Sequence, residues 1–202
     1  MRNIDSYTHT RGESVYLDDI PEIAGTLNAA VYGSPEAHGI IKQLHLDDAL
    51  AVKGVVKILT NKDIPGKNQI GGIVKDEPLL ADGVVHFNGM PVAIVVAENA
   101  DAAHEAVKKI KIDIEPLPVV TLARVAQQNG ALIVPPRTFK IGDSQSAFAQ
   151  CKYIFEGIAE TNGQEHLYIE TQGAYAIPAE NGAIKIYSST QGPTAVQKHC
   201  AE

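Results

Sequence analysis

Short apolar runs separated by turn residues fill the first half of the chain. Residues 26–32, 39–46 and 55–59 are rich in aliphatic and β-branched side chains and are bounded by glycine or polar residues, as strands are. Residues 60–63 have capping-box spacing, but the proline and glycine at 65–66 end any helix within about one turn. This region therefore predicts three strands and a short helical connector.

A strand, a helix and a second strand are predicted to follow in direct succession. Residues 91–97 are almost entirely apolar, the pattern of a strand covered on both faces, and Asn99 can cap the helix that follows. Apolar residues of that helix fall at i, i+3, i+4 and i+7 from Ala103 to Ile110. From residue 110 to 115 the period changes to two, which predicts a half-exposed strand.

The second half begins with a linker. Residues 119–141 follow two prolines that end the preceding strand, and they contain a short helical pattern at 127–130. We expect this linker to lie along a surface, because several of its side chains are apolar. A short helix capped by Asp143 and a strand at 153–161 come next.

A hairpin and a helix complete the prediction. Residues 174–178 and 183–188 form the hairpin, in which an Asn-Gly pair supplies positive φ, and Pro193 suits the first position of the last helix. The predicted fold class is α+β, with domains at 1–118 and 142–202 joined by the linker. The second domain is too small to bury a good core alone, so we expect a truncated domain.

Composition argues against a polyanion-binding surface and a membrane protein. The formal net charge is −7 and the sequence pI is about 5.5, without any basic run that could neutralise phosphates. Residues 1–5 lack the apolar core of a signal peptide, and no segment approaches the ~18 apolar residues that span a bilayer. We therefore expect a cytoplasmic protein that binds neither nucleic acid nor membrane.

Cysteine spacing and common motifs point to no metal or nucleotide site. Cys151 and Cys200 stand far apart, so we expect buried thiols rather than zinc or iron–sulfur ligands. The sequence contains no G-x-G-x-x-G, phosphate-loop or G-x-S-x-G motif. His38 lies between two predicted strands, where we expect it to stabilise a turn.

Two segments are dense in polar chemistry. Residues 163–171 combine two carboxylates, a histidine and a tyrosine, for which a structural polar network is the simplest interpretation. Residues 187–194 lead from a strand into a helix N-terminus, where free backbone amides and the amide of Gln191 suit an oxygen with negative charge. From the residues alone, helix capping by Ser189, Thr190 and Gln191 explains the second segment more simply.

Taken together, these segments resemble the motifs of the molybdenum hydroxylase (xanthine dehydrogenase and aldehyde oxidase) family, in order and approximate spacing. The resemblance covers nearly the whole chain. The segments that carry it are residues 11–21, 34–39, 62–66, 76–81, 89–93, 163–171 and 188–191.

The resemblance implies a fold and one cofactor-proximal residue. Residues up to about Pro118 would form an α/β-hammerhead domain, and the remainder would begin a mixed α/β molybdopterin-binding domain. Gln191 matches the family glutamine whose side-chain amide approaches an oxo ligand of the molybdenum, where a neutral donor stabilises negative charge. The stretch at 165–171 gains no such role, and we expect it near the domain interface. The resemblance implies no catalytic residue in this chain, because the family's glutamate base, glycine-rich cofactor loop and substrate arginine would follow Glu202.

The resemblance also implies partners and a reaction. The family adds water-derived oxygen to heteroaromatic rings or aldehydes and passes electrons through iron–sulfur clusters to FAD. Residues 163–171 favour the xanthine dehydrogenase branch, although Leu167 replaces an aromatic residue and Met90 a glutamine. We expect an inactive fragment that binds no cofactor alone and is completed by the rest of its domain, by iron–sulfur and FAD subunits or domains, and by homodimerisation. The alternatives are another family hydroxylase, acting on aldehydes or N-heterocycles, and a free-standing hammerhead module without catalysis.

Overall fold

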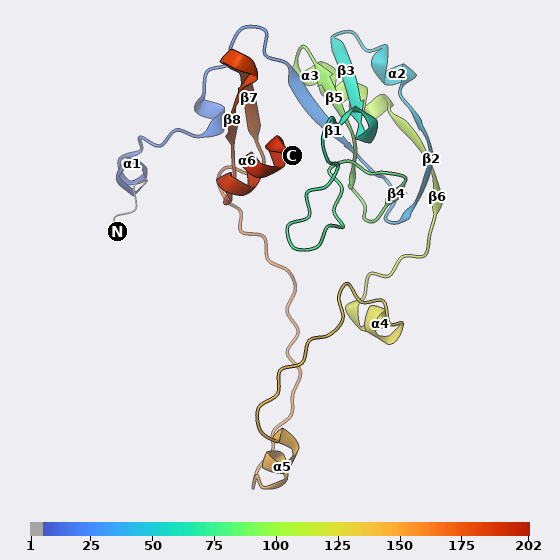
Figure 1. Cartoon of the computed structure of the whole chain (residues 1–202), viewed down its shortest axis with the longest axis vertical. Coiled ribbons are helices and arrows are strands. Elements are labelled where there is room, and N and C mark those ends of the chain that lie inside the picture. The colour runs from blue at the N-terminus through green and yellow to red at the C-terminus, as the bar shows by residue number, and fades with distance from the viewer. Residues whose placement is uncertain (1–5) are drawn as a thin grey trace. The chain divides into compact units, whose positions relative to one another are not determined.

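The structure, a computed structural model, describes residues 6–202 and divides into two units (Figure 1). The first unit comprises Met1–Val119 and Glu170–Glu202, and the second comprises Val120–Ile169. Helices and strands alternate irregularly along the chain, which confirms the α+β class. The first unit contains α1 (Ser6–Arg11), η1 (Leu17–Asp19), β1 (Asn28–Gly33), β2 (Gly39–His45), α2 (Asp47–Leu50), β3 (Val55–Thr60), η2 (Asn61–Asp63), β4 (Val84–Val85), β5 (Pro91–Ala97), α3 (Ala100–Lys109), β6 (Lys111–Pro116), β7 (Ala174–Pro178), η3 (Glu180–Gly182), β8 (Ile184–Ser188) and α6 (Pro193–Ala201).

Strand β5 is the centre of a three-stranded antiparallel sheet with the order β1-β5-β3. Val95 lies opposite Ala30 of β1 and Ile58 of β3. Ala93, Val95 and Ala97 share one face of β5 and are fully buried, whereas on the other face Val92 is buried and Ile94 and Val96 are half-buried. The prediction of a strand covered on both faces therefore holds fully for one face and in part for the other. The apolar run at this position is therefore explained by its place in the middle of the sheet.

Helix α3 packs its alanine-rich face against this sheet. Ala102, Ala103 and Ala106 are buried and belong to the same core cluster as Val95. Asn99 caps the helix, because its side-chain oxygen accepts a hydrogen bond of 2.9 Å from the backbone N–H of Ala102. The predicted cap and apolar stripe are both confirmed, and small side chains allow the helix to approach the strands closely.

A second three-stranded sheet, with the order β4-β2-β6, covers a smaller core. Met90 and Val92 are buried there, and Ile112 and Ile114 of β6 pack against them while remaining half-buried. The alternation of β6 is thus confirmed as the pattern of a strand with one covered face.

The turn between β1 and β2 is organised by Ser34, which is only 2% exposed. Its hydroxyl donates to the carbonyl of Glu36 at 2.9 Å and accepts from the Glu36 N–H at 3.1 Å. The Ser34 backbone bonds to Met90 and Gly89, with both distances 2.8 Å. The segment at 34–39, one of those that carry the family resemblance, therefore has a structural explanation that needs no ligand.

His38 holds the same turn through a distant part of the chain. Its Nδ1 lies 2.7 Å from the carbonyl oxygen of Pro118, and its ring stacks with that of His86 at a centroid distance of 6.1 Å. The Leu117 N–H also donates to the His38 carbonyl at 3.0 Å. His38 thus stabilises the turn, as predicted, by fastening it to the segment that follows β6.

The predicted hairpin and last helix are confirmed. Strands β7 and β8 pair antiparallel from Ala174 with Ser188 to Pro178 with Ile184. Asn181 and Gly182 take positive φ values of 59° and 75° in the turn. Pro193 is the first residue of α6.

The second unit contains only two short helices in its described residues, α4 (Ala123–Gln128) and α5 (Ser144–Ala149). Asp143 caps α5 as predicted, and hydrogen bonds from the hydroxyl and backbone of Ser146 lower the pKa of the Asp143 carboxyl. The predicted strand at 153–161 is absent, because no strand of the described residues pairs with it. A short apolar run was therefore insufficient to predict a strand here.

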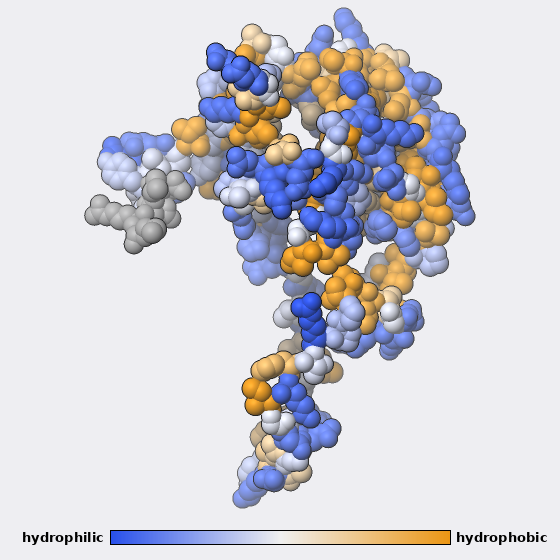
Figure 2. All heavy atoms as spheres, viewed as in Figure 1, coloured by the Kyte–Doolittle hydropathy of each residue, from blue (hydrophilic) through white to orange (hydrophobic). Residues whose placement is uncertain are grey.

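Two expectations about burial are wrong. The apolar side chains of the linker are exposed rather than covered, with Ile133 at 90%, and Figure 2 shows hydrophobic side chains on the surface of this unit. Cys151 and Cys200 are also exposed, and both are free thiols. Within residues 6–202, no helix is long and apolar enough to cross a membrane.

We predict that Gly39→Ala will destabilise the first unit by roughly 1–3 kcal/mol, because an added methyl group overpacks the sheet. A Cβ at Gly39 would collide with Ile114 Cγ2 and lie 2.7 Å from the Glu115 carbonyl oxygen. Gly72→Ala is the matched control, since nothing lies within 4 Å of a Cβ there, and should change stability by less than about 0.5 kcal/mol. Denaturant unfolding of both variants provides the measurement, and equal midpoints would contradict the packing argument.

Candidate functional site

The candidate site is the loop that joins β8 to α6. Strand β8 ends at Ser188, and residues 189–192 connect it to Pro193. Gln191 is exposed in this loop. Its side-chain carboxamide forms no hydrogen bond with the described residues, so both the N–H donors and the oxygen are available to another group.

The backbone of this loop is closed by a side chain. The hydroxyl oxygen of Thr190 accepts a hydrogen bond of 3.0 Å from the N–H of Gly192. Gly192 stands at the N-cap position of α6 without any side-chain cap. Thr190 therefore fixes the peptides on both sides of Gln191, while Gln191 itself does not cap the helix.

The junction presents part of the expected set of free amides, because the N–H groups of Thr190, Gln191 and Thr194 have no partner among the described residues. The N–H groups of Ala195 and Val196 donate to the Gly192 carbonyl at 2.9 and 3.1 Å, and Pro193 has no N–H. In the described structure, the N–H of Thr194 is left as the unpaired donor of this first turn. The side-chain amide of Gln191 therefore lies beside free backbone donors at the same junction.

Aromatic side chains stiffen the hairpin that carries the loop. The rings of Tyr175 and Tyr187 stack across β7 and β8 with centroids 6.3 Å apart. The Lys185 ammonium lies 4.5 Å from the centroid of the Tyr187 ring. Such cross-strand and cation–π contacts stabilise a two-stranded ribbon that would be marginal alone.

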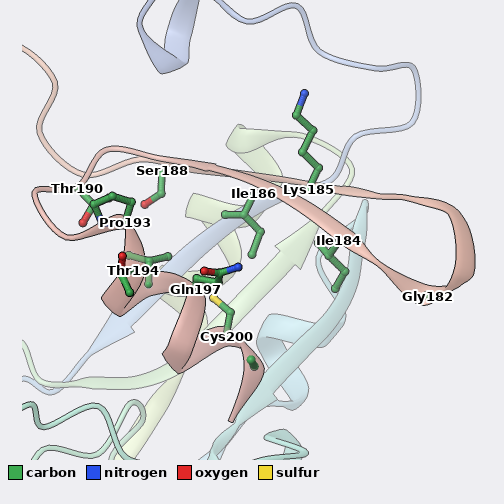
Figure 3. A pocket seen from close by; sticks show the side chains of 12 residues that line it. Gly182, Ile184, Lys185, Ile186, Ser188, Thr190, Pro193, Thr194, Gln197 and Cys200 are labelled. Atoms are coloured by element: carbon green, nitrogen blue, oxygen red, sulfur yellow. The ribbon is translucent and has the colours of Figure 1, made fainter. Parts of the chain in front are cut away.

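A groove of about 800 Å³ runs between β8 and α6 (Figure 3). Ile186 and Gln197 point toward one another across it, whereas Lys185 points away. Thr190 and Pro193 belong to its lining, but Gln191 does not. The structure therefore places Gln191 beyond the groove rather than inside it.

The second predicted segment, residues 163–171, lies mostly on the surface. Its side chains are exposed except for Glu170, which is half-buried. Within the segment, the His166 N–H donates to the Glu165 carboxylate at 2.9 Å. The Glu170 carboxylate instead accepts a hydrogen bond from the backbone N–H of Leu17. That long-range contact had no local signal in the sequence.

Side chains capable of holding a metal directly do not gather at this junction. No three His, Cys, Asp or Glu residues within 6–202 are placed to share a metal ion. An uncharged amide such as Gln191 suits hydrogen bonding to an oxygen of a bound group better than coordination of a metal. The arrangement is that of a donor group held on a fixed backbone.

Two family models match the chain. The first describes the aldehyde oxidase and xanthine dehydrogenase a/b hammerhead domain and matches residues 11–118, just over half of the chain. The chain belongs to the aldehyde oxidase and xanthine dehydrogenase family. The second model, a molybdopterin cofactor-binding domain, matches residues 125–202 and includes Gln191.

Relatives within this family cover almost the entire chain. A xanthine dehydrogenase of Emericella nidulans is 34% identical over 99% of the chain, and aldehyde oxidase 2 of Rattus norvegicus is 37% identical over 98%. The chain spans 15% of the length of each of these relatives. It therefore corresponds to a small part of the curated family members.

Solved structures of molybdenum hydroxylases share this architecture. Aldehyde oxidoreductase from Desulfovibrio gigas aligns with a TM-score of 0.78 and 29% identity, over 92% of this chain and 23% of that structure. Quinoline 2-oxidoreductase from Pseudomonas putida aligns with a TM-score of 0.82 and 27% identity, over 98% of this chain and 27% of that structure. The relatives named here are all oxidoreductases.

We predict that Thr190→Ala will loosen the loop around Gln191, because the Gly192 N–H loses its acceptor. Loss of about 1 kcal/mol from one hydrogen bond corresponds to roughly fivefold faster amide exchange at Gly192. Thr190→Ser keeps the hydroxyl and should restore slow exchange. Thr194→Ala is the control, because its hydroxyl makes no hydrogen bond in the described structure. Equal exchange rates in the Thr190→Ala and Thr190→Ser variants would contradict this role.

Proposed function

We propose that this chain is the N-terminal part of the molybdenum-binding subunit of a xanthine dehydrogenase-type hydroxylase. Residues 1–118 are its hammerhead domain, residues 119–141 the linker, and residues 142–202 the beginning of the first molybdopterin-binding domain. The observation that carries the proposal is the exposed carboxamide of Gln191, which makes no hydrogen bond to the described residues. It stands on a hydrogen-bonded loop within the region that matches the cofactor-binding model.

The residues at the junction fit a molybdenum–molybdopterin group as a neighbour. When bound, that group supplies the redox chemistry of the hydroxylation. Gln191 would hold an amide N–H toward it, and a neutral donor stabilises negative charge without giving up a proton. The N-terminal end of α6 adds a positive dipole at the same place. The hydrogen bond from the Gly192 N–H to the Thr190 hydroxyl already restrains the backbone that carries this donor.

We propose a purine substrate and oxygen derived from water. The features at 163–171 support the xanthine dehydrogenase branch, whereas the 37% identity to rat aldehyde oxidase 2 keeps an aldehyde as the alternative. Iron–sulfur clusters and FAD would be carried by other domains or subunits of a homodimeric cytoplasmic assembly. No such cofactor is assigned to residues of this chain.

The exposed apolar side chains of the second unit support the proposal that another part of the protein covers them. Ile133, Phe155 and Ile158 are 90%, 92% and 84% exposed. Apolar side chains exposed together usually mark a surface that another part of a protein covers. The rest of the molybdopterin-binding domain is the partner that we propose for them.

In the complete enzyme, Gln191→Ala should lower kcat by about 10²–10³-fold and change KM little, because a donor used mainly in the transition state is removed. Steady-state kinetics with xanthine and with an aldehyde would measure both parameters and show which substrate is used. Gln128→Ala, at the exposed end of α4, is the control and should leave kcat unchanged. A Gln191→Ala enzyme with normal kcat and full molybdenum content would refute the assignment.

The 202-residue chain should show no hydroxylase activity by itself, because the glutamate base and the substrate arginine that the family resemblance implies match no residue of this chain. Xanthine oxidation with an artificial electron acceptor, after incubation with molybdenum cofactor, provides the assay. Turnover above that of free cofactor would show that the chain is a complete catalyst and that the proposed division is wrong.

A further inference from the structure

Ser189 follows β8 and leads to Gln191, and its hydroxyl group holds it to Gly173, which precedes β7. Beyond the last ladder pair, Ala174 with Ser188, the Ser189 N–H donates to the Gly173 carbonyl at 3.0 Å. The Ser189 hydroxyl also accepts from the Gly173 N–H at 2.8 Å and lies 3.2 Å from the Gly173 carbonyl oxygen. Ser189 thus engages both backbone groups of Gly173 and extends the pairing by one residue.

Gly173 is supported on its other side by the segment that precedes β1. A Cβ at Gly173 would collide with Leu17 Cδ2, so the Leu17 side chain fills the space beside this glycine. The Leu17 N–H donates to the Glu170 carboxylate, three residues before Gly173. The Tyr16 N–H, in turn, donates to Asp19 at 2.9 Å and closes the turn that presents Leu17.

A second contact of the same segment fixes β7. The hydroxyl oxygen of Tyr175 accepts a hydrogen bond of 2.9 Å from the Ile23 N–H and lies 3.2 Å from the Thr26 hydroxyl. Gly173 is therefore held between Ser189 on one side and a segment tied down at Glu170 and Tyr175 on the other. The backbone at Ser189, two residues before Gln191, is therefore restrained.

We propose that Ser189 is a positioning residue for Gln191 and acts through Gly173. Its hydroxyl fixes the strand end before the loop, while Thr190 fixes the peptides within it. The backbone that carries Gln191 is thereby restrained, and the remaining freedom of its amide is rotation about the bonds of its own side chain. A preorganised donor accelerates a reaction more than a mobile one, which gives Ser189 an effect on catalysis without touching substrate or cofactor. This inference rests on the proposed function of Gln191.

The test is a double-mutant cycle of Ser189→Ala and Gln191→Ala in the complete enzyme. Ser189→Ala should lower kcat about tenfold with KM little changed, and Ser189→Thr, which keeps a hydroxyl, should restore most of it. The double variant should be no slower than Gln191→Ala, because Ser189 acts only through that side chain. An additive loss in the double variant would show a general structural role and overturn the inference.

Two further measurements separate the possible failures. In the 202-residue chain, amide exchange at Gly173 should become roughly fivefold faster in Ser189→Ala but not in the control Ser188→Ala, whose hydroxyl makes no hydrogen bond in the described structure. Unchanged amide exchange at Gly173 would show that the Ser189 hydroxyl does not hold the Gly173 backbone, and would overturn the inference. If Gln191→Ala lowers kcat and Ser189→Ala does not, the positioning role alone is wrong. If neither variant changes kcat, the proposed function fails and the positioning role fails with it.

Discussion

The hydrogen-bond pairing of β5 along both of its edges is the constraint on which the first unit depends. A strand in the middle of a sheet satisfies its backbone only if both neighbours are in register, and here β1 and β3 are paired with it in antiparallel register. The same strand must be apolar on both faces, because α3 packs against its sheet and Val92 belongs to the second core. Small residues in α3 then allow the helix to lie close to the strands.

The sequence predicted those elements whose stabilising groups lie near one another along the chain. The cap at Asn99 and the turn at Asn181 and Gly182 are local, so their residue types were sufficient. The strand expected at 153–161 is rich in apolar residues but does not form, since a strand needs a partner and none of the described strands pairs with it. The predictions that the linker side chains and the two cysteines are buried were wrong for a related reason, because local composition does not say what covers a side chain.

The candidate site could be predicted only in part. Small polar residues before a proline indicate a helix start equally well whether or not the preceding glutamine has a function, and only the family resemblance separated Gln191 from its neighbours. The structure adds that Gln191 makes no hydrogen bond to the described residues, while Thr190 uses its hydroxyl on the Gly192 backbone. The contact of Leu17 with Glu170 had no sequence signal, since 153 positions separate the two residues.

Support for the loop that carries Gln191 therefore comes from a distant part of the sequence. The segment from Leu17 to Thr26 leads directly into β1, and β1 is fixed along β5. A segment anchored at such a strand can hold Tyr175 and the backbone of Gly173 in place, whereas a two-stranded hairpin alone would be marginally stable. The segment that precedes β1 thus supports the backbone beneath Gln191 through its contacts with Glu170, Gly173 and Tyr175.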